Sequence, residues 1–244
     1  MEGSSQAVKK LTILAALLLA FAWQNANAQA AQPQAFSSDA AAERILNLDT
    51  LKAQLKQYHD CTCTCGCYTR DLDKQADRAI AFLRQRAAHR RPNEKLAMVL
   101  DIDETTLSNY EETIGADFAN SDAAFDAWAL EGRAPAIAGT LRLYKEAQRF
   151  SVDIFFITGR WESERAATER NLRAEGFDNW KQLVLRPSDK DTRTATVYKS
   201  LVREQLVAQG YTLVLNVGDQ WSDLKGKPEA EFSVKYPNPF YIIR

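Results

Sequence analysis

The feature that most constrains the fold is a series of short, continuous apolar runs separated by segments of helical length. Such runs are typical of strands buried on both faces of a parallel sheet. They predict strands over residues 96–100, 152–157, 183–185, 213–217 and, at an edge, 232–234. The intervening segments predict helices over residues 122–131, 137–150, 163–175 and 194–209. We therefore expect an α/β fold with a central parallel sheet, right-handed crossovers and flanking helices.

The first residues have the pattern of an export signal. Lys9 and Lys10 precede an uncharged apolar run over residues 11–23, and small residues in Ala-x-Ala spacing lead to Ala28. The run is short for a transmembrane span, which favours a cleaved signal peptide over residues 1–28 rather than an uncleaved anchor. We expect a periplasmic or secreted protein with no membrane anchor in the mature chain.

Two more helices are expected before the first strand, over residues 40–57 and 68–89, with a break at the cysteine run between them. The predicted organisation is a mobile helical and cysteine-rich segment over residues 29–67 and one globular domain over residues 68–244.

Composition limits the chemistry. Only two histidines are present, His59 and His89, so a mechanism that needs a histidine pair or cluster is not expected. Lys+Arg number 31 and Asp+Glu 32, for a formal net charge of −1, which gives no electrostatic basis for a nucleic acid polymer as the partner. Carboxylate, lysine and cysteine side chains remain as the reactive groups.

Polar residues follow three of the predicted strands, at the sheet edge where ligands of α/β proteins bind. Asp101 and Asp103 follow the first strand, and the period of two along extended chain predicts that both side chains project to the same side. Two carboxylates this close resist joint ionisation, which suits one nucleophile and one acid–base group. A solvated acidic turn is the alternative interpretation.

The other two strand ends carry residues that suit a phosphate-binding turn and a cation site. Thr158, Gly159 and the start of a helix would supply a hydroxyl and backbone N–H groups that bind phosphate. The alternative is a strand-to-helix turn in which Thr158 only caps the helix. Asp219 and Asp223 would meet on one face of a helical turn and, with Asp101, offer oxygen ligands suited to Mg²⁺. Three strands that bring such groups to one edge favour a single active site.

Four motifs carry a family resemblance: Asp101-Ile-Asp-Glu-Thr, Ile157-Thr-Gly-Arg160, Tyr198-Lys-Ser200 and Gly218-Asp-Gln-Trp-Ser-Asp-Leu224. In this order they resemble the motifs of the haloacid dehalogenase superfamily. Together with Phe125-Asp-Ala-Trp128, Phe155-Phe156 and Thr168-x-x-Asn171-Leu172, they are similar to the secreted subfamily IIIB acid phosphatases, which include bacterial class C acid phosphatases and plant vegetative storage proteins. The resemblance implies a haloacid dehalogenase-like Rossmannoid fold with a small helical cap.

The resemblance also implies roles for the matching residues. Asp101 would be the nucleophile that forms an aspartyl-phosphate. Asp103 would protonate the leaving alcohol and then activate the hydrolytic water. Thr158 and the backbone of Gly159 would hold phosphate oxygens, and Lys199 would stabilise the transferring phosphoryl group.

The implied cofactor is Mg²⁺, bound by Asp219, by one oxygen of Asp101 and by the main-chain carbonyl of Asp103. Asp223 would either bind the ion directly or orient the water molecules bound to it. Lys199 is favoured over Lys190 and Lys181 as the active-site lysine, because it lies in the motif that matches the subfamily.

The segment 109–135 lies where this superfamily usually inserts a cap. Its short length suggests an open site for small-molecule phosphate monoesters, with loose specificity. Trp161 and Trp221 follow the second and fourth motifs, and each would either stack on an aromatic leaving group or pack against the sheet edge.

Cys61, Cys63, Cys65 and Cys67 are all the cysteines of the chain and do not belong to the subfamily's motifs. In an exported protein they would form intrachain disulfides or intermolecular ones. Coordination of Zn²⁺ or Cu(I) is the third alternative.

The expected function is an exported Mg²⁺-dependent acid phosphatase that hydrolyses small phosphate monoesters through an aspartyl-phosphate; a homo-oligomer is left open. The alternatives are a catalytically weak storage or binding protein of the same fold, or an envelope metal-binding or redox protein that uses the cysteine run. The presence of Asp101 argues against the storage protein.

Overall fold

The computed structural model describes residues 45–63, 67–119 and 121–243. The chain divides into two units, residues 1–47 and 48–244, and every helix and strand named below lies in the second. The predicted signal peptide and the start of the predicted helix over residues 40–57 lie outside the described residues.

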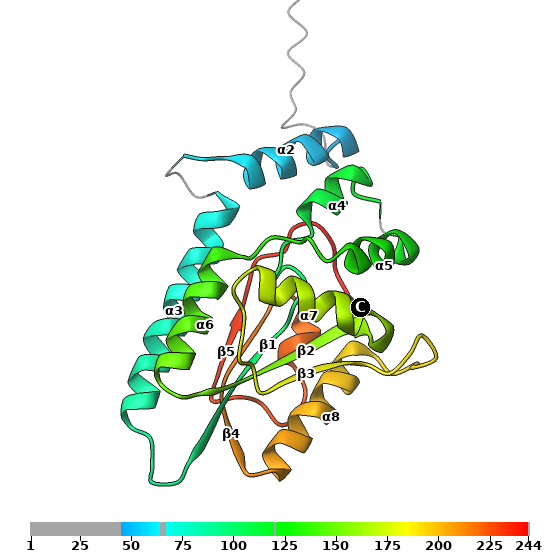
Figure 1. Cartoon of the computed structure of the whole chain (residues 1–244). Coiled ribbons are helices and arrows are strands. Elements are labelled where there is room, and N and C mark those ends of the chain that lie inside the picture. The colour runs from blue at the N-terminus through cyan, green and yellow to red at the C-terminus, as the bar shows by residue number, and fades with distance from the viewer. Residues whose placement is uncertain (1–44, 64–66, 120, 244) are drawn as a thin grey trace, which may run out of the picture. The chain divides into compact units, whose positions relative to one another are not determined.

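A five-stranded parallel sheet forms the centre of this unit (Figure 1), in the order β3-β2-β1-β4-β5. The strands are β1 (Lys95–Leu100), β2 (Asp153–Trp161), β3 (Gln182–Arg186), β4 (Tyr211–Gly218) and β5 (Phe232–Lys235). All five were predicted. In the register Leu100 is paired with Phe156 on β2 and with Val217 on β4, so the three central strands end at a common edge.

Helices cover both faces because buried side chains alternate along the strands. On β1, Met98 and Leu100 belong to the larger core, against α3 (Tyr68–Ala88) and α6 (Ala138–Arg149). Ala97 and Val99 belong to the second core, against α8 (Ala195–Ala208). The predicted α/β architecture, with a parallel sheet between helices, is confirmed.

The end of β2 corrects one prediction. Thr158, Gly159 and Arg160 lie within the strand, where Trp161 is paired with Arg186 of β3, and do not start a helix. A 3₁₀ turn, η1 (Glu162–Glu164), intervenes before α7 (Arg165–Ala174). The carboxylate of Glu164 accepts the N–H of Trp161 at 2.6 Å, which closes this turn after the strand.

The segment 109–135 holds two helices, α4 (Tyr110–Gly115) and α5 (Asp122–Glu131). Ser121 accepts the N–H of Ala124 at the start of α5, and Gly132 ends the helix with a φ of 64°. Beyond the short helix α9 (Trp221–Leu224) and β5, the C-terminal tail (residues 236–243) returns to the edge where the strands end, and its Tyr236 N–H bonds to Gly218.

Helix α2 (Leu48–Asp60) belongs to the same unit as the sheet, although it precedes the predicted domain start at Tyr68. Its His59 ring stacks on Tyr110 of α4 with ring centroids 3.3 Å apart. Cys61 and Cys67 form an intrachain disulfide, the first of the three alternatives for this run. The sulfur of Cys63 lies 3.7 Å from that of Cys67, and Cys65 is outside the described residues.

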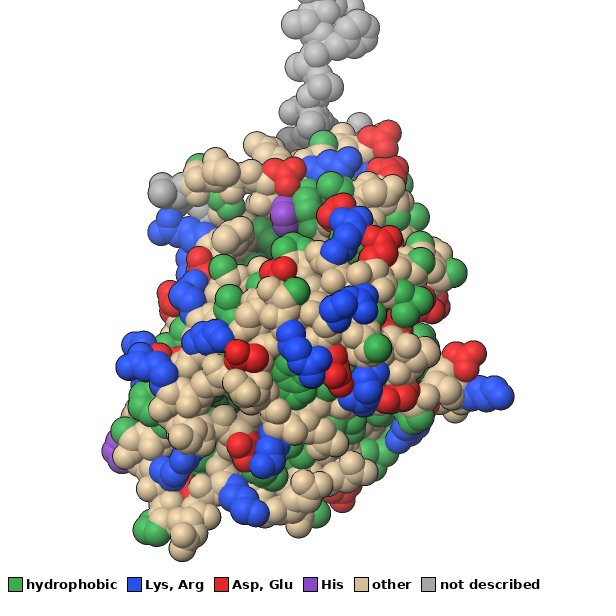
Figure 2. All heavy atoms as spheres, viewed as in Figure 1, with side chains coloured by type: hydrophobic (Ala, Val, Ile, Leu, Met, Phe, Trp, Pro, Cys, Tyr) green, Lys and Arg blue, Asp and Glu red, His purple; other side chains and the backbone are tan. Residues whose placement is uncertain are grey.

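Basic and acidic side chains are interspersed on the face of the molecule seen in Figure 2. This mixture agrees with the balanced composition and forms no continuous basic surface among the described residues of that face. Within the described part of the chain, no helix is long and apolar enough to span a bilayer.

Candidate active site

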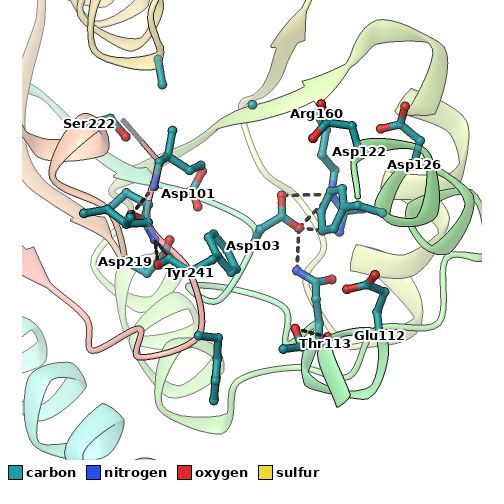
Figure 3. A pocket seen from close by; sticks show the side chains of 18 of the residues that line it. Asp101, Asp103, Glu112, Thr113, Asp122, Asp126, Arg160, Asp219, Ser222 and Tyr241 are labelled. Carbon is teal, nitrogen blue, oxygen red and sulfur yellow. Dashed lines mark hydrogen bonds and ion pairs between the residues drawn. The ribbon is translucent and has the colours of Figure 1, made fainter. Parts of the chain in front are cut away.

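The edge where β1, β2 and β4 end opens into a cavity of about 530 Å³ (Figure 3). Six of the seven predicted site residues line it: Asp101, Asp103, Gly159, Lys199, Asp219 and Asp223. They come from separate parts of the chain, and the parallel sheet brings them together because the strands share this edge.

Asp101 directly follows β1 and is 6% exposed. Its backbone N–H bonds to Val217 and its carbonyl accepts the hydroxyl of Thr106 at 2.5 Å, so the main chain is fixed on both sides. The ammonium of Lys199, from α8, donates to Asp101 Oδ1 at 2.5 Å and to Asp223 Oδ1 at 2.6 Å.

Lys199 is therefore the lysine that the structure places in the site. Its side chain is 6% exposed and lies between two carboxylates. Burial by itself would lower its pKa, but the charges of Asp101 and Asp223 outweigh burial and raise the pKa above its ordinary value. Lys190 is exposed on the loop before α8 and does not line the cavity.

Asp219 and Asp223 are held by the start of α9. The carboxylate of Asp223 accepts the N–H of Gln220 at 2.8 Å, and a Cβ at position 218 would overlap that carboxyl. Gly218 is thus required by close approach, which explains its place beside Asp219. The carboxylate of Asp219 accepts hydrogen bonds from Thr105 at 3.1 Å and from Gln220 and Asn238 at 2.7 Å.

One oxygen from each of Asp101, Asp219 and Asp223 lies within 4.8 Å of the other two, and all three residues are buried. Burial first, and then the charge of Asp223, raises the pKa of Asp219 to about 7. Burial likewise raises the pKa of Asp101 well above its ordinary value, against the opposing charge of Lys199. Three buried carboxylates with one lysine leave an excess of negative charge, and hard oxygen donors in this number suit a divalent cation such as Mg²⁺.

Asp103 lines the same cavity but is held by a different cation. The Arg160 guanidinium donates to Asp103 Oδ1 from Nη2 at 2.7 Å and from Nε at 3.0 Å, and Asn109 donates to the same oxygen at 2.9 Å. Figure 3 shows Asp103 between the Asp101–Asp219 side of the cavity and Arg160. Arg160 was in a recognised motif but received no role from sequence reasoning.

Thr158 does not face the cavity in this structure. Its side chain is fully buried and its hydroxyl accepts the backbone N–H of Arg160 at 3.2 Å. Gly159 lines the cavity, and no described atom lies within 4 Å of where its Cβ would stand. The phosphate-binding role stays a prediction for both residues, with room for a ligand only at Gly159.

A second buried network joins the site to the C-terminal tail. Glu104, at a φ of 51°, accepts hydrogen bonds from the N–H of Asn109 at 2.6 Å and from the hydroxyl of Tyr241 at 2.6 Å. Burial first, and then the charge of Asp103, raises the pKa of Glu104 to about 7. Sequence reasoning missed Tyr241 and Asn238 because the tail has no periodic pattern that would reveal its return to the site.

The two tryptophans have different surroundings. Trp161 lines the cavity and lies under the guanidinium of Arg186, 5.5 Å from its ring centroid. Trp221 is 56% exposed and does not line this cavity. It lines a separate pocket beside α9 and β5. Stacking on a ligand bound beside Asp101 therefore remains open only for Trp161.

Comparison with known proteins agrees with this geometry. Residues 19–244 match the model of the HAD superfamily, subfamily IIIB (acid phosphatase). The chain is 42% identical to acid phosphatase 1 of Solanum lycopersicum over 149 residues, which cover 59% of this chain and 58% of that protein. It is 34% identical to vegetative storage protein 1 of Arabidopsis thaliana over 205 residues, covering 82% of this chain and 74% of that protein.

The fold is similar to that of the class C acid phosphatase from Bacillus anthracis, with a TM-score of 0.66. The superposition covers 80% of this chain and 86% of that one, at 22% sequence identity. Since the family model extends over most of the chain, the protein belongs to the subfamily IIIB acid phosphatase family of the HAD superfamily.

Proposed function

We propose that this protein is an Mg²⁺-dependent acid phosphatase that hydrolyses small phosphate monoesters through an aspartyl-phosphate. The observation that carries the proposal is the Asp101 carboxylate at the end of β1, with Oδ1 bound to Lys199 and two further carboxylates beside it. Its Oδ2 accepts no hydrogen bond from the described residues and is the atom available for attack.

In the first step, Asp101 Oδ2 forms a bond to phosphorus while the bond from phosphorus to the ester oxygen breaks. A protonated Asp103 carboxyl gives its proton to the leaving oxygen, so the alcohol departs neutral. Arg160 and Asn109, which both contact Asp103 Oδ1, would hold this carboxyl in position.

In the second step, a water molecule attacks the phosphorus of the aspartyl-phosphate and gives its proton to the Asp103 carboxylate. The bond between phosphorus and Asp101 breaks, which restores the carboxylate and releases inorganic phosphate. Lys199 donates to Asp101 Oδ1, the oxygen that does not attack, and its ammonium would stabilise negative charge on the carboxylate and on the transferring phosphoryl group.

The residues that would hold Mg²⁺ are Asp101, Asp219 and Asp223, whose side-chain oxygens converge within 4.8 Å, together with the main-chain carbonyl of Asp103. When bound, the ion supplies neutralisation of charge on the phosphate oxygens. Thr105, Gln220 and Asn238 fix the orientation of the Asp219 carboxylate for this role.

The proposal includes export of the protein to the periplasm or the exterior of the cell. The amino-terminal pattern of Lys9, Lys10 and the apolar run over residues 11–23 supports a signal peptide, with Ala28 as the last residue removed. The disulfide between Cys61 and Cys67 suits an oxidising compartment such as the periplasm or the exterior. Amino-terminal sequencing of the protein from a secreting host tests this: a mature chain that begins at Gln29 is the expected result.

A storage role is the second candidate, since vegetative storage proteins are among the similar chains. The complete set of Asp101, Asp103, Lys199 and Asp219 around one cavity favours the phosphatase over this alternative.

The test is phosphate release from p-nitrophenyl phosphate by the purified mature protein, after treatment with EDTA and again after Mg²⁺ is restored. We expect turnover that EDTA removes and Mg²⁺ returns. A folded protein that releases no phosphate with any divalent cation would favour the storage protein instead.

A further inference from the structure

The half of the cavity away from the nucleophile is lined by four carboxylates that the reaction does not use: Glu112 on α4, Asp122 and Asp126 on α5, and Glu164 at the end of η1. Figure 3 shows three of them, Glu112, Asp122 and Asp126, on the opposite side of Asp103 from Asp101 and Asp219. We call these four residues the acidic wall.

No residue of the acidic wall forms an ion pair with any part of the chain that the structure describes. Glu164 is the strongest case, because it is 2% exposed and its Oε1 is buried without a hydrogen-bond partner among the described residues. Its other oxygen is used by the N–H of Trp161. Glu164 lines the cavity, and a buried carboxylate oxygen without a donor is costly when the group is ionised, so a positive charge nearby would offset that cost.

The two arginines that line the cavity, Arg160 and Arg186, contact groups outside the acidic wall. Arg160 is held by Asp103, its side chain only 1% exposed. Arg186 faces Asp191 at 3.7 Å and donates to the carbonyl of Arg193. The charge of Arg160 acts on Glu164, but no described residue forms an ion pair with the four carboxylates. The electrostatic potential of the acidic wall therefore favours a positive charge on the bound molecule.

Burial raises the pKa of Glu112, Asp126 and Glu164 above their ordinary values, and for Asp126 the charge of Asp122 adds to this effect. A cation bound among these carboxyl groups would lower their pKa values again, because it favours the ionised forms.

Aromatic rings complete the same part of the cavity. Phe118, Phe125, Trp161 and Phe240 all line it. The faces of such rings attract cations, but Lys56, Arg160 and Arg186 already lie over Phe118, Phe125 and Trp161, at 5.8, 5.9 and 5.5 Å from the ring centroids. The rings therefore supply apolar surface, and the carboxylates supply the attraction for a cation. Carboxylates spread over α4, α5 and η1 beside apolar rings suit an organic ammonium group better than a small metal ion, which would need a compact set of oxygen ligands.

We propose that the acidic wall selects phosphate monoesters whose alcohol carries an ammonium group, such as O-phosphocholine and O-phosphoethanolamine. This inference rests on the proposed function, since it places the phosphate at Asp101 and the leaving alcohol toward α4 and α5. The two halves of such a substrate match the two halves of the cavity: phosphate meets Lys199 and the metal-binding carboxylates, and ammonium meets the acidic wall. Monoesters whose alcohol carries a carboxylate should be rejected.

The first measurement compares kcat/KM for phosphocholine with that for 3,3-dimethylbutyl phosphate, in which carbon replaces the ammonium nitrogen. We expect a preference of about 10-fold or more for phosphocholine, because only this ester carries a positive charge that the acidic wall attracts. The double variant E112Q/D126N should bring this ratio toward one. The control is E111Q on the same helix, because Glu111 is paired with Arg133 and does not line the cavity; it should keep the preference.

The second measurement does not depend on turnover. Calorimetric titration with choline alone should show binding to the wild-type protein, and binding about 10-fold weaker to E112Q/D126N. Absence of choline binding, a wild-type ratio near one, or a ratio that survives in the double variant would each overturn the inference. Turnover of p-nitrophenyl phosphate separates the two proposals: a protein that hydrolyses it but neither of these esters overturns the inference alone. A protein that hydrolyses none of the three refutes the proposed function, and choline binding then decides whether the acidic wall is a cation site.

Discussion

Asp101 and Asp103 are two residues apart in the chain, yet each is held by a cation of its own. Lys199 contacts one oxygen of Asp101, whereas Arg160 contacts both oxygens of Asp103, with Nη2 donating to Oδ1 at 2.7 Å and Nε to Oδ2 at 3.3 Å. A fork of this kind fixes the plane of a carboxylate, whereas a single ammonium fixes only the position of one oxygen. The two carboxylates are thus held differently, and the mechanism proposed above gives them different roles: nucleophile for Asp101 and acid–base group for Asp103.

The contact between Arg160 and Asp103 leads to the first prediction. In R160K the charge is kept but the fork is lost, so the acid–base group is misplaced relative to the leaving oxygen. We expect kcat to fall by about 100-fold with KM within about threefold, because the loss is in positioning for the reaction and not in binding. Steady-state kinetics with p-nitrophenyl phosphate measures both parameters.

The control for this prediction is R165K, because Arg165 at the start of α7 contacts Glu162 and the carbonyl of Leu183 instead of Asp103. It should leave kcat nearly unchanged. An R160K enzyme with wild-type kcat would show that Arg160 has no positioning role.

At this scale the sequence was informative where a motif stands at a strand end, as for Asp101, Asp219 and Asp223. It could not reveal Arg160 as the partner of Asp103, because that contact depends on β2 continuing through Trp161. The same extension of β2 brings the Thr158 hydroxyl to the N–H of Arg160, and the predicted contact of Thr158 with phosphate stays a prediction.

At the scale of elements, the C-terminal tail is the part that completes the site. Tyr236 bonds to Gly218 at the end of β4, and from there Asn238 reaches Asp219 while Tyr241 reaches Glu104. Partners behind a metal ligand orient it and raise its affinity for the ion. The tail should therefore govern metal affinity although it carries no metal ligand.

The second prediction follows from this contact. In N238A the Asp219 carboxylate loses one of its three donors, so we expect the Mg²⁺ concentration for half-maximal activity to rise by about 10- to 100-fold. Titration of the EDTA-treated enzyme with Mg²⁺ measures the shift. Q209A removes an exposed amide at the end of α8 and should shift nothing; an equal titration curve for N238A would refute the role of the tail.

Most elements could be predicted because apolar runs and helical spacing are local properties of the sequence. The helix over residues 122–131 was predicted with the observed bounds, which Ser121 and Gly132 explain as cap residues. The path of the tail could not be predicted, since it depends on hydrogen bonds to residues far away in the chain. The same holds for the stacking of His59 on Tyr110, which joins α2 to α4.

At the scale of the whole molecule, the candidate site lies at one end of the sheet and a cluster of ion pairs lies at the other. The site lies where the strands end, while Glu94, just before β1, ties together the elements at the opposite end. Its carboxylate binds Arg86 of α3 at 2.6 Å, Arg91 at 2.7 Å and the hydroxyl of Thr212 on β4 at 3.2 Å. Arg86 also binds Glu231, just before β5.

This cluster gives the third prediction, on acid stability. Hydrogen bonds from Arg86 first, and then from Arg91, lower the pKa of Glu94 below its ordinary value of 4.5. The stability that Glu94 contributes is therefore fully present above pH 4.5 and is lost as the pH falls below it. We expect E94Q to be less stable than the wild type at pH 7 and the difference to shrink in acid.

Urea unfolding at pH 7, 4.5 and 3 measures this difference in the free energy of unfolding. E229Q is the control, because Glu229 forms an exposed pair with Lys227 and should matter little at any pH. The kcat of E94Q at pH 7 should match the wild type, since Glu94 does not line the cavity. A constant difference between E94Q and wild type across the pH range would contradict the assignment.

The central claim is that Asp101 accepts the phosphoryl group, and one measurement tests it most directly. The protein is mixed with p-nitrophenyl phosphate and Mg²⁺, quenched in acid and digested, and its peptides are analysed by mass spectrometry. We predict a phosphoryl group on the peptide that contains Asp101, and in D101N neither this adduct nor phosphate release, with kcat lower by at least about 10³-fold. A folded D101N protein that turns over at the wild-type rate would contradict the account.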